Sequence, residues 1–433
     1  MNSLWHDGIA LPEFTSLNKD CKTDVLIIGG GITGILTAYF LHQKGVNYIL
    51  VEKDRICQGV TGNTTAKITY QHNLIYNKIM KNDSPAQAKA YLYANKKAFD
   101  LYKSMCQDID CDYEIKNNYV YSVDNRKKIE DEIIALDKIG YDAEFCSEIK
   151  LPIKIAGAIC FPNQAQFHPL KFLSNISKNL NIHENTFVKE MIGNTAVTNN
   201  HKIQADKVIV ATHFPFINKY GAYFLKLYQD RSYVIALNNA QDVDGMYIDE
   251  NQKGMSFRNY KNLLLIGGGA HRAGKNGGNW SELRSFAGIK YPSAKEVFHW
   301  SAQDCMSLDS MPYIGHYSNR TTDLYTATGF NKWGMTGSML AANILSDMVT
   351  DTENEYADVF SPSRSILQPQ LAVNGFEAIT NLLTISKKRC PHLGCALKWN
   401  NAEHSWDCPC HGSRFTESGR VIDNPANGNL KMS

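Results

Sequence analysis

The chain has 433 residues, of which 43% are hydrophobic and 20% charged, and its 45 lysines and arginines nearly balance its 43 aspartates and glutamates. One compact core rarely serves so long a chain, so we expect two or three structural units. The overall charge balance gives no support for nucleic acid or an anionic membrane as a partner and favours small molecules or another protein.

The beginning of the chain, "MNSLWHDGIALPEF", lacks the basic and apolar regions of a secretory signal. Because no stretch of about 18 apolar residues is present, we expect a cytoplasmic protein without a membrane span. Seven of the eleven cysteines are scattered, which is typical of reduced thiols. The other four lie together between residues 390 and 410 and require a separate explanation.

Residues 23–54, "TDVLIIGGGITGILTAYFLHQKGVNYILVEKD", predict a strand, a tight turn, a helix and a second strand. Gly29 permits the turn, Gly31 lets the backbone approach a pyrophosphate, and Gly34 lets the helix pack closely on the strand. The helix N-terminus then faces the phosphates, and Glu52 is placed to accept hydrogen bonds from a ribose. The pattern predicts a dinucleotide site, NAD or FAD, to which we also assign Ile32, Thr33 and Lys53.

A Gly/Thr loop follows, "CQGVTGNTTAK". Its hydroxyls and backbone amides suit phosphate or ribityl oxygens, which makes Thr61, Thr64 and Thr65 candidate cofactor contacts. An ordinary surface turn is the alternative. Residues 84–109 and 125–145 then show helical periodicity with charged faces, and Ser84 is positioned to cap the first of these two helices.

Two later segments return to the same predicted sheet. Residues 185–215 predict two or three strands that end in the buried "KVIVAT", preceded by a helix with Pro169 in its first turn. Residues 324–349 predict the strand "LYTATG" and an amphipathic helix beginning near Gly334.

The opening unit with Glu52, "KVIVAT" and the late "PYIG...TATGF...GMT", taken in this order, resemble the D-amino-acid-oxidase-like superfamily of FAD-dependent oxidoreductases over roughly residues 20–350. The resemblance implies an α/β fold with an α+β cap. A discontinuous Rossmann-like FAD-binding domain would carry a mostly antiparallel substrate domain. We place the FAD-binding pieces at about 20–75, 155–215 and 300–350, the substrate pieces at about 76–154 and 216–299, and a linker at 351–368.

The resemblance also implies residue roles. The helix N-terminus at Gly334, Met335 and Thr336 would lie near the flavin N1/C2 carbonyl, and the backbone of Val188 would contact adenine. Ala211, Thr212 and Gly329 complete the cofactor candidates. FAD is expected to be non-covalent, because Asn63 stands where some relatives attach the flavin through histidine and Cys305 does not have the spacing of their attachment cysteine.

The catalytic residues are not identified by any motif. Candidates to bind a polar substrate group are Arg231, Arg258, His271, Arg272 and Lys332. Relatives that reduce oxygen rapidly often place a lysine above the flavin, in a strand that corresponds here to residues 262–274. That strand has no lysine, so fast oxidase chemistry is not supported.

The C-terminal cysteines form two clusters with histidines: Cys390-x-His392 and, after fifteen residues, Cys408-x-x-His411. A zinc site accepts two cysteines and two histidines. A Rieske [2Fe–2S] centre binds one iron through two cysteines and the other through two histidines. The mixed pair in each cluster favours the second interpretation.

"CPHLGC" and "CPCHGS" resemble the two cluster-binding loops of the Rieske family. The resemblance implies a small all-β unit at 369–433, a disulfide between Cys395 and Cys410, and histidine edges that remain partly exposed for electron exit. The unit is shorter than a full Rieske domain, since only residues 376–388 precede the first loop. It is therefore expected either to lean on the FAD domain for its core or to be truncated.

A flavin accepts electron pairs and an iron–sulfur cluster carries single electrons, so both on one chain predict a relay. The whole chain resembles bacterial FAD-dependent oxidoreductases with a C-terminal Rieske domain, and we expect oxidation of a C–N bond of an amine or amino acid with electron transfer through the cluster to an external acceptor. The alternatives are an oxygen-reducing oxidase with a structural cluster and a redox sensor without its own substrate. The substrate, the acceptor and the oligomeric state are left open.

Overall fold

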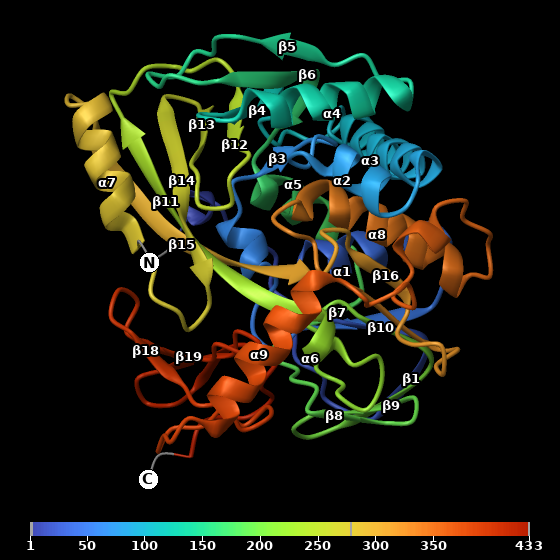
Figure 1. Ribbon diagram of the computed structural model, residues 1–433. Helices are drawn as coiled ribbons and strands as arrows, with labels where there is room; N and C mark the ends of the chain where they lie inside the picture. Colours follow the sequence, from blue (N-terminus) through green and yellow to red (C-terminus); the bar gives the residue numbers. More distant parts are fainter. Residues whose placement is uncertain (1–2, 278, 432–433) are drawn as a thin grey trace.

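The computed structural model describes residues 3–277 and 279–431, which form two large sheets, a small third sheet and the helices that cover them (Figure 1). The first sheet has the strand order β16-β17-β10-β1-β2-β7, with β8 and β9 added beside β10. Its strands are β1 (Cys21–Ile28), β2 (Tyr48–Val51), β7 (Ile182–His183), β8 (Glu190–Ile192), β9 (Thr195–Val197), β10 (Lys202–Val210), β16 (Tyr313–His316) and β17 (Leu324–Thr328).

The central strands β2, β1, β10 and β17 are parallel, as the βαβ motif requires. Residues 25–28 of β1 are all buried, and such a continuous apolar run is typical of a parallel strand covered on both faces. The pairing of β1 with β10 and of β10 with β17 confirms that "KVIVAT" and "LYTATG" return to the sheet of the opening unit, as the sequence predicted.

Helices α1 (Ile32–Gln43) and α8 (Gly334–Val349) pack on each other beside this sheet, and α3 (Pro85–Met105) covers α8. Thr33 and Ser338 join α1 to α8 through a hydroxyl pair 2.8 Å apart. Ser84 caps α3 by accepting a hydrogen bond from the backbone N–H of Gln87 at 3.1 Å, as predicted. The other helices in this part of the chain are η1 (Leu4–His6), η2 (Val60–Asn63), α2 (Ile75–Asn82), α4 (Arg126–Lys138) and α5 (Pro169–Ser177).

The second sheet has the order β15-β11-β14-β13-β12-β4-β6-β3, with β5 beside β6, and is mostly antiparallel. Its strands are β3 (Lys67–Ile68), β4 (Glu114–Ser122), β5 (Glu144–Cys146), β6 (Gly157–Gln166), β11 (Leu227–Asn238), β12 (Met246–Asp249), β13 (Ser256–Tyr260), β14 (Leu263–Arg272) and β15 (Lys295–Ser307). Helices α6 (Tyr223–Lys226) and α7 (Asn279–Lys290) flank it.

Two expected boundaries are wrong. Strand β6 belongs to the second sheet, although residues from 155 onward were assigned to the FAD domain. Strand β15 pairs with β11 as far as Ser307, past the expected boundary at 300. In both cases the strand pairing that decides the sheet joins residues far apart in the sequence, so local composition does not locate the crossing.

The C-terminal part contains the antiparallel third sheet, formed by β18 (Lys398–Asn400), β19 (Ser405–Asp407), β20 (Arg414–Thr416) and β21 (Val421–Asp423). The expected linker packs on the body of the protein. Phe360 of η3 (Ala357–Phe360) is buried, and Arg364 forms an ion pair with Asp309. Residues before the first cysteine cluster form the helix α9 (Pro369–Leu383). The segment 376–388, which precedes the first ligand loop, is therefore largely helical.

Candidate functional site

The dinucleotide motif has the geometry that its glycines require. Gly29 has φ +116°, and a Cβ there would lie 2.5 Å from the carbonyl oxygen of Ala211 on the neighbouring strand. A Cβ at Gly34 would lie 1.9 Å from the carbonyl oxygen of Gly29, so any side chain at position 34 would force α1 away from β1. The N-terminus of α1 is thereby fixed at the end of the sheet.

Glu52 follows β2 and faces this turn. One carboxylate oxygen accepts a hydrogen bond from the backbone N–H of Gly30 at 2.7 Å and the other from Asp54 at 3.1 Å. Burial raises the pKa of Glu52, and these two N–H groups act in the opposite direction. Thr61 accepts a hydrogen bond from the backbone N–H of Ile32 at 3.0 Å, which places the Gly/Thr loop at the start of α1.

A cavity of about 1030 Å³ opens beside this motif and extends along the second sheet. Its volume is suited to a cofactor together with a small substrate. Of the predicted cofactor contacts, those on its wall are Gly29, Gly31, Ile32, Thr33, Glu52, Lys53, Thr61, Thr64, Thr65, Val188, Ala211, Thr212, Gly334 and Met335. The opening unit, the segment that follows β10 and the start of α8 therefore meet at one cavity.

Three predicted contacts lie behind this wall. Gly34 packs on Gly29, and Gly329 has φ +73° at a turn where a Cβ would lie 3.2 Å from Leu227. Thr336 donates a hydrogen bond to the carbonyl of Thr69 at 2.9 Å. These residues shape the backbone around the cavity and do not line it, and their contact with the cofactor stays a prediction.

Of the five substrate-binding candidates, only Lys332 is on the cavity wall. Arg258 is buried, stacks on Trp5 and donates to the carbonyl of Ala66 at 2.8 Å. His271 stacks on Tyr233 with ring centroids 5.7 Å apart. Arg231 and Arg272 bind the C-terminal unit, as described below.

Sequence reasoning missed Lys67, a half-buried lysine of β3 on the cavity wall. Burial lowers the pKa of Lys67 to about 7, and the charge of Arg258 lowers it further. Among the described residues, the ammonium group of Lys67 has one hydrogen-bond partner, the Thr65 hydroxyl 3.4 Å away. An isolated lysine in a two-residue strand carries no recognisable motif.

The two cysteine and histidine loops have the same backbone geometry. In the first, the N–H of Gly394 donates to Cys390 and the N–H of Cys390 to Cys395. In the second, the N–H of Gly412 donates to Cys408 and the N–H of Cys408 to Ser413. Both glycines have φ near +80°, a conformation that side chains disfavour, so each loop needs glycine four residues after its cysteine.

The four predicted ligands converge between these loops. The thiols of Cys390 and Cys408 are within hydrogen-bond reach of each other. The rings of His392 and His411 have centroids 4.9 Å apart, and the Nδ1 atoms of both are buried without a hydrogen-bond partner among the described residues. Two paired thiols and two orphaned imidazole nitrogens are the donor set that a Rieske cluster uses, so the residues fit this group.

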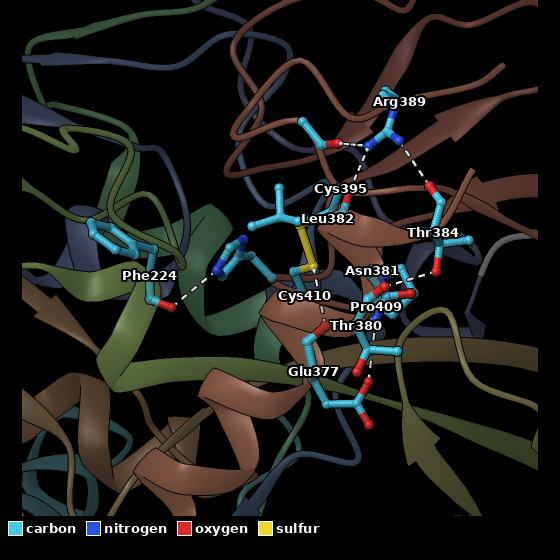
Figure 2. The surroundings of a disulfide bond; sticks show 12 residues. Phe224, Glu377, Thr380, Asn381, Leu382, Thr384, Arg389, Cys395, Pro409 and Cys410 are labelled. Carbon is cyan, nitrogen blue, oxygen red and sulfur yellow. Dashed lines mark hydrogen bonds between the residues drawn. A yellow bond between two sulfur atoms is a disulfide. The ribbon is translucent and has the colours of Figure 1, made fainter. Parts of the chain in front are cut away.

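The structure contains the Cys395–Cys410 disulfide, which links the two loops (Figure 2). The sulfur of Cys408 lies within 4.8 Å of both disulfide sulfurs. Because Cys395 and Cys410 are bonded to each other, their sulfurs are not available as ligands. Arg389 fixes the first loop by donating to the carbonyls of Leu382, Thr384 and Gly394.

The histidine edges face the body of the protein. Nε2 of His411 is 3.0 Å from the carbonyl oxygen of Phe224, and Nε2 of His392 is 2.9 Å from the side-chain oxygen of Asn218. Phe214 lies against both rings, at centroid distances of 6.1 and 6.4 Å. His392 is half-buried, but His411 is only 4% exposed. The expectation of partly exposed edges is met at His392 and wrong at His411, which the flavin-side segment covers.

Polar contacts anchor the C-terminal unit to the second sheet. Arg231 of β11 donates to both carboxylate oxygens of Glu403, and Arg272 of β14 donates to the carbonyls of Pro409 and Cys410 at 2.9 and 3.0 Å. Gln303 donates to the carbonyl of Gly412 at 2.7 Å. These arginines hold the unit in place, and their guanidinium groups are occupied.

The unit also completes the cavity. Residues 420–424, together with Thr416, Ala426 and Asn427, lie on the cavity wall. The side chain of Asn424 donates to the carbonyls of Thr212 and Phe214, whose segment runs from the cavity to the two histidines. The short C-terminal unit is therefore packed against the FAD domain and bound to it by hydrogen bonds.

No helix in the described part of the chain combines the length and apolar character that crossing a bilayer requires.

Comparisons with known proteins agree with this geometry. Residues 24–348 match the family of FAD dependent oxidoreductases (DAO), and residues 363–432 match the Rieske [2Fe-2S] domain. The protein YhfW of Bacillus subtilis (strain 168) is named as a Rieske 2Fe-2S iron-sulfur protein. It is 34% identical to this chain over an alignment 491 residues long, which covers 99% of this chain and 96% of YhfW. The cytochrome b6-f complex iron-sulfur subunit of Nostoc punctiforme is 48% identical over 44 residues, 10% of this chain and 25% of that subunit.

Among solved structures, glycine oxidase from Geobacillus kaustophilus superposes with a TM-score of 0.66 at 19% identity, covering 80% of this chain and 99% of that one. L-proline dehydrogenase from P. horikoshii gives 0.67 at 19% identity, covering 80% and 98%. L-amino acid deaminase from Proteus vulgaris gives 0.64 at 14% identity, covering 82% and 100%. At these identities the likeness establishes the fold.

Proposed function

The chain belongs to the DAO family of FAD-dependent oxidoreductases and carries a C-terminal Rieske [2Fe–2S] domain, and from this premise we propose that it oxidises a C–N bond of an amine or amino acid and passes the electrons to an external acceptor through the Rieske cluster. FAD supplies two-electron oxidation when bound, and the cluster supplies one-electron transfer.

The observation that carries the relay is the shared wall between the two sites. The Rieske unit contributes residues 420–424 to the cavity that the dinucleotide motif opens into. Its buried ligand His411 faces the segment 211–224, and the first residues of that segment, Ala211 and Thr212, are on the cavity wall. A unit with a purely structural cluster does not need its ligand edges against a segment that begins at the cavity wall.

The choice of substrate class rests on the cavity cations and on the solved structures. Lys67 and Lys332 supply positive charge on the cavity wall, which suits the carboxylate of an amino acid. Three proteins of the same fold are named for glycine, proline and amino acids as substrates. We propose that Lys67 pairs with the substrate carboxylate, because it is the more deeply buried of the two lysines.

Anaerobic reduction tests the proposal. The holoprotein is mixed with amino acids and amines while flavin absorbance and the electron paramagnetic resonance signal of the reduced cluster are recorded. We expect one substrate to bleach the flavin and reduce the cluster, and a one-electron dye to reoxidise both. Rapid reoxidation by oxygen without cluster turnover would identify an oxidase. A flavin that no substrate bleaches, beside a cluster that a protein partner reduces, would identify a redox sensor.

We also propose that FAD is non-covalent. Cys305 lies on the cavity wall, but burial raises the pKa of its thiol to about 12, so the reactive thiolate is absent at neutral pH. Acid precipitation of the holoprotein is expected to leave the flavin in the supernatant, and a yellow pellet would contradict this.

A further inference from the structure

Helix α9 presents its apolar side to solvent. Its buried positions are the polar residues Asn374 and Asn381, each 4% exposed. Asn374 accepts a hydrogen bond from Arg272 and donates to the carbonyl of Leu225, so this polar face is the one that packs on the protein. The hydrophobic periodicity of α9 therefore belongs to an outward face.

That outward face is a continuous apolar stripe. Its residues within the helix are Val373, Phe376, Ile379, Leu382 and Leu383, which are 43–78% exposed. The stripe continues at both ends of the helix with Leu367 (83%) and Ile385 (98%). Figure 1 shows α9 in red-orange across the front of the molecule. Exposed apolar patches of this kind mark interaction sites.

The charge around the stripe identifies the partner. Between residues 361 and 400 the sequence has five basic residues and one acidic residue, Glu377. Arg364 is neutralised by Asp309 and Glu377 by Lys275 at 2.7 Å, which leaves four basic residues. Three of the basic residues, Lys387, Lys388 and Arg389, follow Ile385 after one intervening serine. The balanced charge of the whole chain conceals this local excess.

A second copy of the chain is a poor complement, because it would bring the same positive excess against itself. An anionic lipid surface complements both features, since it accepts an apolar stripe with Phe and Leu and attracts nearby Lys and Arg.

We propose that the α9 surface, residues 367–389, binds the protein peripherally to an anionic lipid bilayer. Leu382 lies against Gly394 of the first ligand loop, where Leu393 is 40% exposed. The loop of the half-buried ligand His392 is therefore adjacent to the proposed membrane face. The proposal does not depend on the proposed reaction, because lipid binding is measured without substrate.

Vesicle co-sedimentation of the full holoprotein tests this. We expect binding to vesicles of phosphatidylglycerol and phosphatidylcholine that weakens with salt and is lost on phosphatidylcholine alone. The double variant Phe376→Ser, Ile379→Ser is expected to lower the partition coefficient by at least about ten-fold, since both side chains lose their apolar area. Lys387→Gln is expected to lower it by about five-fold. The matched control Ile192→Ser, Ile289→Ser removes two isoleucines that are similarly exposed, 62% and 76%, on other elements and should leave binding unchanged.

Three results would overturn the proposal: absence of binding to the anionic vesicles, equal binding by the Phe376→Ser, Ile379→Ser variant, or a dimer in light scattering that this variant converts to a monomer. The last result would show that a second copy covers α9. In each case flavin and cluster reduction by substrate stays measurable, so failure here is distinguishable from failure of the proposed function.

Discussion

Glu403 is the carboxylate that fastens the Rieske unit to the rest of the protein. It is buried between Arg231 of β11 and Arg414 of β20, and Ser301 of β15 donates to it at 2.6 Å. Burial raises the pKa of Glu403, but the hydrogen bond and charge of Arg231 and the charge of Arg414 outweigh it and lower the pKa from 4.5 to about 2. At 1.36 kcal/mol per pKa unit, the ionised carboxylate stabilises the folded protein by about 3 kcal/mol at neutral pH.

We predict that Glu403→Gln removes this contribution and leaves the buried Arg231 without its carboxylate partner, while Arg414 keeps Asp407 and Asp423. A loss of about 3 kcal/mol raises the population of the open unit about a hundred-fold, so backbone amides of β18, β19 and β20 should exchange about a hundred-fold faster. Mass-spectrometric hydrogen exchange at neutral pH measures this. Glu417→Gln, an exposed glutamate of the same unit, is the control.

The pH dependence has a definite sign. Because the folded pKa is lowered, the stabilisation is complete above about 4.5 and is lost as pH falls toward 2. The wild-type unit should therefore lose protection over this range, and the Glu403→Gln variant should lose less. Unchanged protection in the variant at neutral pH would refute the reasoning.

Three further changes have expected outcomes. Cys408→Ser should reduce iron from about two atoms per chain to none while FAD is retained, measured by metal analysis and flavin absorbance, with Cys21→Ser as control. Gly34→Ala should abolish FAD retention, because its Cβ would lie 1.9 Å from the Gly29 carbonyl oxygen, whereas Gly288→Ala, which meets no atom within 4 Å, should retain FAD. Lys67→Met should raise KM for carboxylated substrates but not for simple amines in steady-state assays. Because Lys67 loses its proton above about pH 7, the wild-type KM for carboxylated substrates should rise above that pH and that of the variant should stay flat.

The parts of the fold that sequence predicted are those specified by residues close together in the chain. The glycines of the first turn, the capping Ser84 and the two ligand loops each depend on spacings of a few residues. Such spacings are visible without knowledge of the tertiary structure.

The parts that sequence did not predict depend on distant residues. Arg231 and Glu403 are 172 positions apart, so the arginine was interpreted as a substrate contact when its partner is the Rieske unit. The sequence analysis predicts an all-β unit from residue 369 and no helix α9, whose inward Asn374 is held by Arg272, about a hundred positions away. Lys67 became recognisable only when the cavity placed it beside the cofactor motif.

The shared wall has a consequence for assembly. Gly29 and residues 420–424 line one cavity although they lie far apart in the sequence, so this wall is complete only while the C-terminal unit is docked. Cys408 and His411, at 0% and 4% exposure, are covered in the docked unit. Docking of the C-terminal unit therefore couples completion of the cavity wall to enclosure of these two residues.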